Sequence, residues 1–190
     1  MRIVVGITGA SGVIYGITLL EALKKLEIET HLILSRQAEK IIALETSCTP
    51  AEVQALASHT YGESDFDAPL ASGSFLHHGM VIAPCSMKTL AGIAAGYADN
   101  LIQRAADVTI KEGRRLVLVP RESPFSAIHL ENMLKLARLG VAIAPPVPAF
   151  YNRPETIADL VEFTVGRVLD LLGVENQLFR RWTGTPVGEF

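Results

Sequence analysis

The sequence is poor in charge and in cysteine, and it lacks any long apolar run. Only 19% of its 190 residues are charged, and only Cys48 and Cys85 are cysteines. No apolar run approaches the roughly 18 residues that a membrane span requires. The run after Arg2 has only the length of a strand, unlike a secretory signal. Two cysteines suit a reducing compartment better than a disulfide framework, so we expect a cytoplasmic protein. Because no apolar run is long enough to span a bilayer, we expect no membrane partner.

The charge balance gives no reason to expect a nucleic-acid partner. Lys and Arg number 17 against 20 Asp and Glu, which leaves a formal net charge of -3 at pH 7, whereas nucleic-acid-binding surfaces are strongly basic. Hydrophobic residues make up 49% of the chain, and its mean hydropathy is +0.31. We therefore expect a sizeable core, with part of the apolar surface lying in interfaces between subunits.

Strand-length apolar runs alternate with helix-length periodic segments. The pattern predicts strands over 3–8, 30–35, 80–84, 115–120 and 141–144, and helices over 13–26, 37–46, 50–57, 86–95, 101–111, 127–139 and 154–172. The polar stretch 59–78 is predicted as one long loop. Alternation at this spacing requires crossover connections, so we expect a single α/β domain over 1–184 with a parallel sheet covered on both faces.

The first strand is followed by a glycine-rich loop, and ligands of such folds bind at the carboxyl ends of strands. The loop consists of Gly9, Ala10, Ser11 and Gly12. Glycines let the backbone approach an anion, and the next helix presents free N–H groups. The spacing is G-x-x-G-x-x-G, however, and not the dinucleotide pattern G-x-G-x-x-G. A tight turn without a ligand is the alternative.

The end of the second strand carries no carboxylate, which an NAD site would need for the ribose hydroxyls. Ser35 and Arg36 stand there instead, and this favours a mononucleotide over NAD. Ser35 has an equally simple structural interpretation, because serine is a preferred N-cap of a following helix.

Two further strand ends carry polar motifs. The third strand is followed by Ser86, Met87, Lys88 and Thr89. A helix N-terminus with a cation and two hydroxyls suits an anion or the edge of a flavin. Arg121 and Glu122 follow the fourth strand, where the arginine could bind a phosphate or pair with the glutamate on the surface. Cys85 is predicted to be a buried structural residue, since no partner histidine stands out.

No pair of His, Cys or carboxylate residues has a spacing typical of a metal site. Asp65 and Asp67 do not form the DDxxD arrangement that holds magnesium on an isoprenoid diphosphate. His77 and His78 lie near a strand start, away from the expected ligand edge, and are predicted to be structural. We therefore expect no metal.

These motifs together resemble one family, the flavin prenyltransferases of the UbiX type. The matching stretches are GITGASGVIYG, LETS around Glu45, SGSF at 72–75, APCSMKTLAGIA, RAADVTIKE, LVLVPRESPFS, PPVPAFYNRP and VGRVLDLLG. Each is modest by itself, but their order and spacing from residue 1 to about 184 are specific. Residues 185–190 fall outside the resemblance, and this C-terminal tail could derive from a cloning vector.

The resemblance implies a flavodoxin-like α/β fold that assembles into trimers and dodecamers. It implies an enzyme that transfers a dimethylallyl group from dimethylallyl phosphate onto N5 and C6 of reduced FMN. The product, prenylated FMN, is the cofactor of UbiD-type decarboxylases, and ubiquinone biosynthesis is one pathway that could receive it. The family requires no metal.

The resemblance also implies roles for individual residues. It implies FMN contacts for Gly9, Ala10, Ser11, Ser35, Ser86, Met87, Lys88, Thr89 and Arg121. It implies a dimethylallyl phosphate site made of Arg104, Lys111, Tyr151 and Arg167. It implies catalytic roles for Ser11, Glu45, Lys111, Glu122 and Trp182. Without the resemblance, Arg104, Lys111 and Arg167 would be solvated helix charges and Trp182 an anchor of the tail. Because these residues come from separate segments, neighbouring subunits could complete the site.

Two other functions fit parts of the pattern. FMN-dependent cysteine decarboxylases share the fold. They carry a PxSANT motif, however, where this chain has PCSMKT, and they use a catalytic histidine in an early helix. The first histidine here, His31, falls in the second predicted strand. A carrier that only delivers FMN would have no use for Arg121 or for the pair Tyr151 and Arg167.

Overall fold

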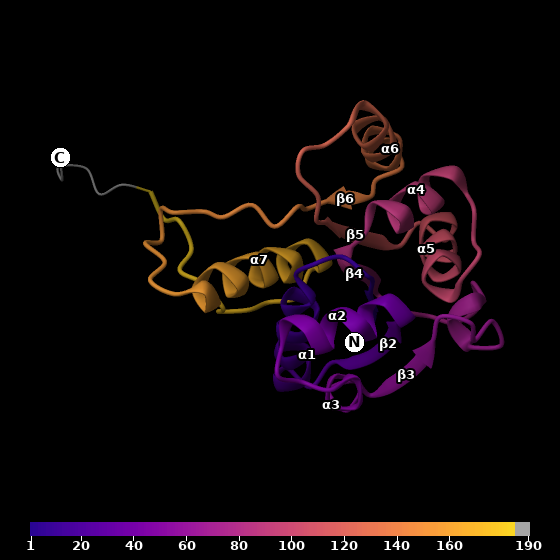
Figure 1. The fold of residues 1–190 in the computed structure, drawn as a ribbon, viewed down its shortest axis with the longest axis horizontal. Coiled ribbons are helices and arrows are strands. Elements are labelled where there is room, and N and C mark those ends of the chain that lie inside the picture. Colours follow the sequence, from indigo (N-terminus) through magenta and orange to yellow (C-terminus); the bar gives the residue numbers. More distant parts are fainter. Residues whose placement is uncertain (185–190) are drawn as a thin grey trace.

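The computed structural model describes residues 1–184, so the predicted tail over 185–190 lies outside the described residues. Its centre is one parallel sheet of six strands in the order β3-β2-β1-β4-β5-β6 (Figure 1). The strands are β1 (Arg2–Ile7), β2 (Glu29–Leu34), β3 (His59–Gly62), β4 (Gly79–Cys85), β5 (Arg115–Pro120) and β6 (Ala142–Ile143). Every pairing within the sheet is parallel. The predicted flavodoxin-like α/β architecture is confirmed.

Helices cover both faces of this sheet (Figure 1). They are α1 (Val13–Lys25), α2 (Arg36–Glu45), α3 (Pro50–Gln54), α4 (Met87–Ala95), α5 (Leu101–Lys111), α6 (Ala127–Arg138) and α7 (Ile157–Leu172), with a 3-10 turn, η1 (Pro69–Ala71). Alternate strand residues supply two cores. In β1, Ile3 and Val5 pack with α1 and α7, whereas Val4 packs with α4 and α5. This two-sided burial explains why the strands read as continuous apolar runs.

Two sequence predictions are wrong. The stretch 59–78 is not one loop, because it contains the edge strand β3 and the turn η1. Three of the four residues of β3 are exposed and the fourth is half-buried, so the strand left no apolar run to detect. The last helix begins at Ile157 and not at Pro154, because Thr156 is its N-cap and forms a capping box with Asp159.

The C-terminal part of the chain extends beyond the sheet. After β6 an extended segment runs to the far end of α7, and residues 174–184 then fold back along that helix (Figure 1). Gly166 makes this return possible, because a Cβ there would clash with the ring of Phe179. The Asn176 side chain donates hydrogen bonds to the Gly166 carbonyl (3.1 Å) and to Asp170 (3.0 Å). None of the helices in residues 1–184 is long and apolar enough to cross a membrane.

Candidate active site

Thr8 joins two of the loops that leave the carboxyl edge of the sheet. Its hydroxyl donates a hydrogen bond to the carbonyl of Pro84 at 2.8 Å and accepts one from the N–H of Ser86 at 2.8 Å. The neighbouring strand ends are also aligned, since Ile7 pairs with Leu34. The polar segments predicted after β1, β2, β4 and β5 therefore meet at one edge.

Glu45, the last residue of α2, lies at the N-terminus of α1. Its carboxylate accepts hydrogen bonds from the backbone N–H groups of Gly12 (2.8 Å) and Val13 (3.4 Å). Slight burial raises the pKa of Glu45, but hydrogen bonding from Ser11 and from these two N–H groups outweighs it, so the pKa lies below its ordinary value. Glu45 is therefore ionised at neutral pH, and it occupies the place where the sequence suggested a bound phosphate.

Arg121 lies beside this cluster. A Cβ on Gly12 would lie 4.0 Å from Cγ of Arg121, and the guanidinium charge contributes to the lowered pKa of Glu45. Among residues 1–184, no salt bridge joins Arg121 to Glu122, whose carboxylate accepts the N–H of Ser123 at 3.0 Å. The surface-pair interpretation is therefore wrong, and both charged groups are exposed at the carboxyl edge.

Two predicted flavin contacts also serve as helix caps. The Ser35 hydroxyl accepts the N–H of Ala38 at 3.1 Å, which confirms the N-cap interpretation of this serine. Ser86 accepts the N–H of Thr89 at 3.3 Å and donates to its hydroxyl at 3.0 Å. Lys88 is exposed in the first turn of α4. Because Ser35 caps through its oxygen, it keeps an O–H donor for a ligand. The O–H of Ser86 is given to Thr89, so this serine can offer a ligand the remaining lone pair of its oxygen.

Cys85 is buried at the end of β4. Burial in this apolar setting raises the pKa of its thiol, so the reactive thiolate is disfavoured. The structure agrees with the prediction that Cys85 is a structural residue and not a nucleophile.

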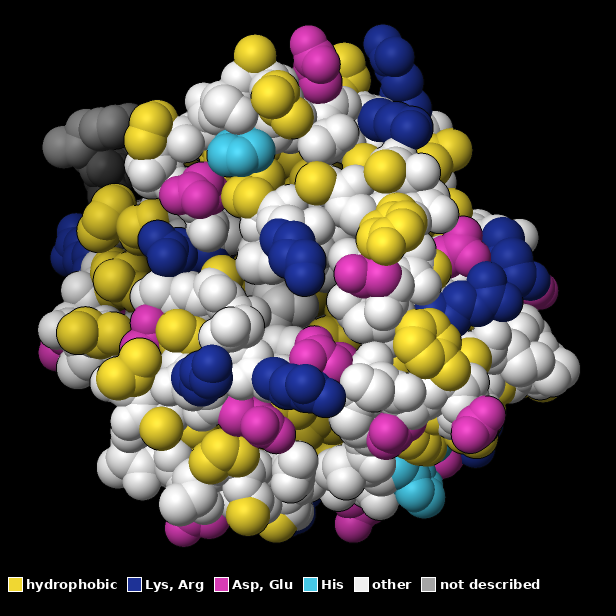
Figure 2. Space-filling view, turned by 45° about the vertical axis from the view of Figure 1, so that its right-hand side comes forward, with side chains coloured by type: hydrophobic (Ala, Val, Ile, Leu, Met, Phe, Trp, Pro, Cys, Tyr) yellow, Lys and Arg dark blue, Asp and Glu magenta, His cyan; other side chains and the backbone are white. Residues whose placement is uncertain are grey.

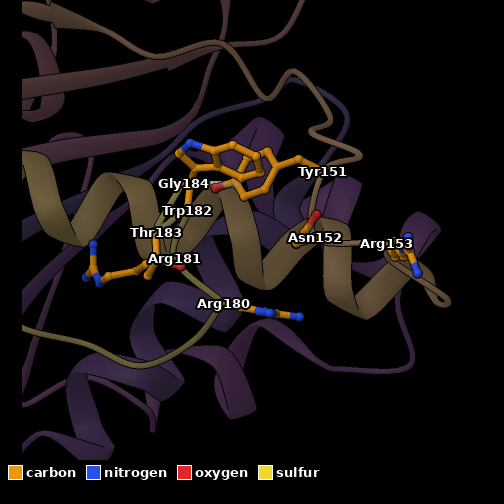
Figure 3. A pocket seen from close by; sticks show the side chains of 8 residues that line it. All are labelled: Tyr151, Asn152, Arg153, Arg180, Arg181, Trp182, Thr183 and Gly184. Carbon is orange, nitrogen blue, oxygen red and sulfur yellow. The ribbon is translucent and has the colours of Figure 1, made fainter. Parts of the chain in front are cut away.

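A second cluster lies on the C-terminal extension, where Tyr151 and Trp182 pack edge to face with ring centroids 5.7 Å apart (Figure 3). They border a pocket of about 320 Å³. The pocket is lined by Tyr151, Asn152, Arg153, Arg180, Arg181, Trp182, Thr183 and Gly184. Sequence reasoning did not single out the arginines of this pocket, although Arg180 and Arg181 directly precede Trp182. An aromatic wall beside three guanidinium groups suits a ligand with an apolar part and an anionic part.

Arg167 reaches this cluster only through Asp170. Asp170 forms an ion pair with Arg167 at 2.8 Å and with Arg181 at 2.7 Å. Hydrogen bonding from Arg181, helped by the charge of Arg167, holds the pKa of Asp170 below its ordinary value. Within one chain Arg167 does not line the pocket, so the predicted pairing with Tyr151 is indirect.

Arg104 and Lys111 lie in a third place, along α5. Arg104 forms an ion pair with Asp107 at 2.8 Å and donates to the carbonyl of Ala71 at 3.1 Å. Lys111 is paired with Glu112 and lies just before β5, at the amino edge of the sheet. Within one chain, the predicted phosphate-binding residues therefore occupy different regions.

Comparison with known proteins identifies the family. The Flavoprotein family model matches residues 1–169. The flavin prenyltransferase LpdB of Lactiplantibacillus plantarum is 58% identical over 184 residues, which cover 96% of this chain and 98% of that protein. This chain belongs to the UbiX-like flavin prenyltransferase family. The resemblance drawn from the sequence motifs is confirmed.

Two solved UbiX-like structures match the fold closely. The dodecameric FMN-dependent UbiX-like decarboxylase from Escherichia coli O157:H7 is 56% identical, with a TM-score of 0.95 over 97% of this chain and 100% of that one. The second is AnUbiX (PadA1) in complex with FMN and dimethylallyl pyrophosphate. It is 52% identical, with a TM-score of 0.96 over 97% and 98% of the two chains.

Proposed function

We propose that this UbiX-like protein is a flavin prenyltransferase that joins the dimethylallyl group of dimethylallyl phosphate to N5 and C6 of reduced FMN. The observation that carries the proposal is the convergence of Ser11, Glu45 and Arg121 at the carboxyl edge. Family membership supports it, as does the AnUbiX complex with FMN and a dimethylallyl donor.

The donor groups at this edge fit FMN by their chemistry. Hydroxyls of Ser35 and Ser86, together with Lys88 and Arg121, can hydrogen-bond to the phosphate and to the polar edge of the isoalloxazine. Because Glu45 already occupies the N–H groups that begin α1, we expect the glycine loop to contact the flavin ring and not its phosphate.

The overall reaction breaks one C–O bond and forms one N–C and one C–C bond. Two protons leave the flavin, one from N5 and one from C6; one is gained by the alkene and the other by the departing phosphate. Glu45 and Glu122 lie at the carboxyl edge and can move these protons. Because Glu45 is ionised at rest, it can accept a proton without prior loss of one.

The donor site must stabilise a phosphate as negative charge grows on its leaving oxygen. We propose that Lys111, Arg121 and Arg167 do this, with the Tyr151 hydroxyl and Arg104 as further donors. Trp182 offers a π face to the allylic group as positive charge develops there, and such contacts contribute about 0.5–2 kcal/mol.

We propose that neighbouring subunits bring these groups together in a homo-oligomer of trimers, up to a dodecamer. The separation of Lys111 and Arg104 from the other groups within one chain supports this, as does the dodecameric E. coli relative. Apolar side chains are also exposed over α6, at the top of Figure 2. They include Ile128, Leu130 and Leu134, each more than half exposed, and such surfaces are typical of interfaces.

Family membership supports the remaining assignments. We propose that the transfer needs no metal and that the product serves a UbiD-type decarboxylase in the cytoplasm, with ubiquinone biosynthesis as one candidate pathway. We also propose that the protein has no nucleic-acid partner. On the face in Figure 2, acidic and basic side chains of the described residues are interspersed and do not form one basic patch.

The donor can be tested by supplying dimethylallyl monophosphate and diphosphate separately to the protein and reduced FMN without oxygen. We expect prenylated flavin and inorganic phosphate from the monophosphate at the higher rate. A faster reaction with release of pyrophosphate from the diphosphate would overturn the assignment of the donor.

A further inference from the structure

His31 and His59 are directly opposed in the parallel pairing of β2 with β3. Register partners in a parallel pair project their side chains to the same face of the sheet. The two imidazole rings accordingly stack, with centroids 4.6 Å apart and an interplanar angle of 24°. The pair lies near the amino ends of its strands, at the edge of the sheet opposite the Glu45 cluster.

Glu29 adds a carboxylate to this pair. It stands two residues before His31 on the same strand, and so its side chain points to the same face. Its Oε1 atom lies 3.0 Å from Nε2 of His31 and 3.7 Å from Nε2 of His59. One ligand atom from each of the three residues falls within 4.8 Å of the other two.

Tyr61 fixes the orientation of the inner histidine. Its hydroxyl lies 2.9 Å from Nδ1 of His31, which directs Nε2 toward Glu29. Metal-binding histidines characteristically use their second ring nitrogen for such a hydrogen bond. The His31 side chain is 4% exposed and that of His59 is 54% exposed, so one ligand is anchored while solvent reaches the other.

We propose that Glu29, His31 and His59 form a binding site for one Zn²⁺ or a similar divalent transition-metal ion, with water completing the coordination. Two imidazoles and one carboxylate are a donor set that Zn²⁺ accepts, whereas Mg²⁺ and Ca²⁺ prefer oxygen ligands. Tetrahedral bonds of about 2.0–2.1 Å place neighbouring ligand atoms roughly 3.4 Å apart. The observed separations of 3.0 and 3.7 Å lie on either side of that value.

The positive charge of Arg2 would disfavour binding of a metal ion at this site. Its Nε donates to the same Oε1 of Glu29 at 2.9 Å, and its guanidinium lies over the ring of Phe75 at 4.8 Å. A metal must share this carboxylate with the arginine and tolerate a nearby positive charge. Removal of the arginine should therefore tighten metal binding, which an unspecific histidine contact would not show.

A metal ion in this position would join two strands. His59 belongs to the four-residue edge strand β3, and Glu29 and His31 belong to its neighbour β2. The ion would therefore stabilise the pairing of the edge strand. Because the Glu45 cluster lies at the opposite edge, this proposal does not depend on the proposed prenyl transfer and is compatible with a metal-free reaction.

The test is a titration of the metal-stripped full chain with Zn²⁺ alone, in competition with a chromogenic chelator. We expect one ion per chain and a loss of affinity of roughly tenfold or more in His59→Gln. Arg2→Gln should bind several-fold more tightly. The control is His129→Gln on α6, which keeps an acceptor for the Ser126 capping box and should bind as the unaltered chain does.

Three results would overturn the proposal. They are the absence of a stoichiometric site, equal affinity in His59→Gln and the unaltered chain, and an equal loss in His129→Gln. A rise in melting temperature with Zn²⁺ that is absent in His59→Gln, with no change in the rate of flavin modification, would support the structural role.

Discussion

The Glu45 carboxylate accepts a hydrogen bond from the backbone N–H of Gly12 at 2.8 Å, although 33 positions separate the two residues. The contact supplies the N-terminus of α1 with a negative charge from the end of α2. It also holds Glu45 beside Ser11, so that two distant sequence motifs form one unit. We therefore expect this carboxylate to matter both for stability and for the chemistry proposed at the carboxyl edge.

Glu45→Gln should lower stability in a pH-dependent way. The pKa of Glu45 is lowered in the folded protein from its ordinary value of 4.5, so its ionised form stabilises the fold above that pH. The stabilisation is lost as the pH falls through the lower folded pKa. At pH 7 we expect a cost of about 0.5–1 kcal/mol, because the side chain is largely exposed.

Melting temperatures measured from pH 7 down to pH 3 check this expectation. The difference between the unaltered chain and Glu45→Gln should shrink below about pH 4.5. Glu21→Gln is the matched control, because Glu21 is exposed on α1 and its side chain makes no hydrogen bond among the described residues. A difference that is independent of pH would contradict the role of the charge.

Thr8→Val should loosen the carboxyl edge. The hydroxyl of this buried residue bridges Pro84 and Ser86. Its removal leaves the N–H of the half-buried Ser86 without this acceptor, while the Pro84 carbonyl keeps only the backbone N–H of Thr8 at 3.3 Å. We expect a loss of about 1–3 kcal/mol in the free energy of unfolding and weaker binding of FMN. Denaturant unfolding and flavin titration measure the two effects.

Thr109→Val is the control for that substitution. Thr109 is also buried, but its hydroxyl bonds chiefly back to the carbonyl of Ala105 in its own helix at 2.7 Å. Such bonds contribute little to a helix, so this variant should keep its FMN affinity. Equal effects of the two valine variants on FMN binding would show that Thr8 has no special role in the site.

Asp170→Asn should release Arg167 and the pocket residue Arg181. The carboxylate of Asp170 binds both Arg167 and Arg181 and is only 18% exposed. We expect a stability loss of about 1–2 kcal/mol at pH 7 and a higher KM for dimethylallyl phosphate. Asp107→Asn removes the comparable but more exposed pair with Arg104 and should cost no more than about 0.5 kcal/mol.

Mixed oligomers should reveal whether neighbouring subunits share the donor site. Lys111→Ala and Tyr151→Phe are each expected to reduce prenyl transfer strongly. If the two groups meet across an interface, dissociated and reassembled mixtures contain some sites with both native residues. Activity of the mixture should then exceed that of either variant alone, and a mixture no more active than its components would place both groups in one chain.

The sequence predicted the buried strands well, because β1 and β5 are apolar at every position after their first residue. It did not predict β3, because this exposed edge strand carries no apolar signal. It placed the start of the last helix at a proline, although the capping box of Thr156 and Asp159 determines that boundary. Hydrophobic periodicity therefore identified the core, while exposed elements depended on pairing and capping.

In the candidate site, too, the sequence located some residues but not the contacts that only the folded chain creates. Residues directly after strands were placed correctly at one edge, because a parallel sheet brings its carboxyl ends together. The contact of Glu45 with Gly12 was not predicted, because it joins two helix ends that have no common sequence pattern. The cluster of Glu29, His31 and His59 was also missed, since only the register between β2 and β3 brings its histidines together.

The mass of the flavin released after anaerobic incubation with reduced FMN and dimethylallyl phosphate tests the proposed function most directly. The account predicts a flavin heavier by one isoprene unit, formed in stoichiometry with inorganic phosphate and strongly reduced in the Glu45→Gln variant. Recovery of FMN with an unchanged mass, from protein that is folded and has bound the flavin, would contradict it.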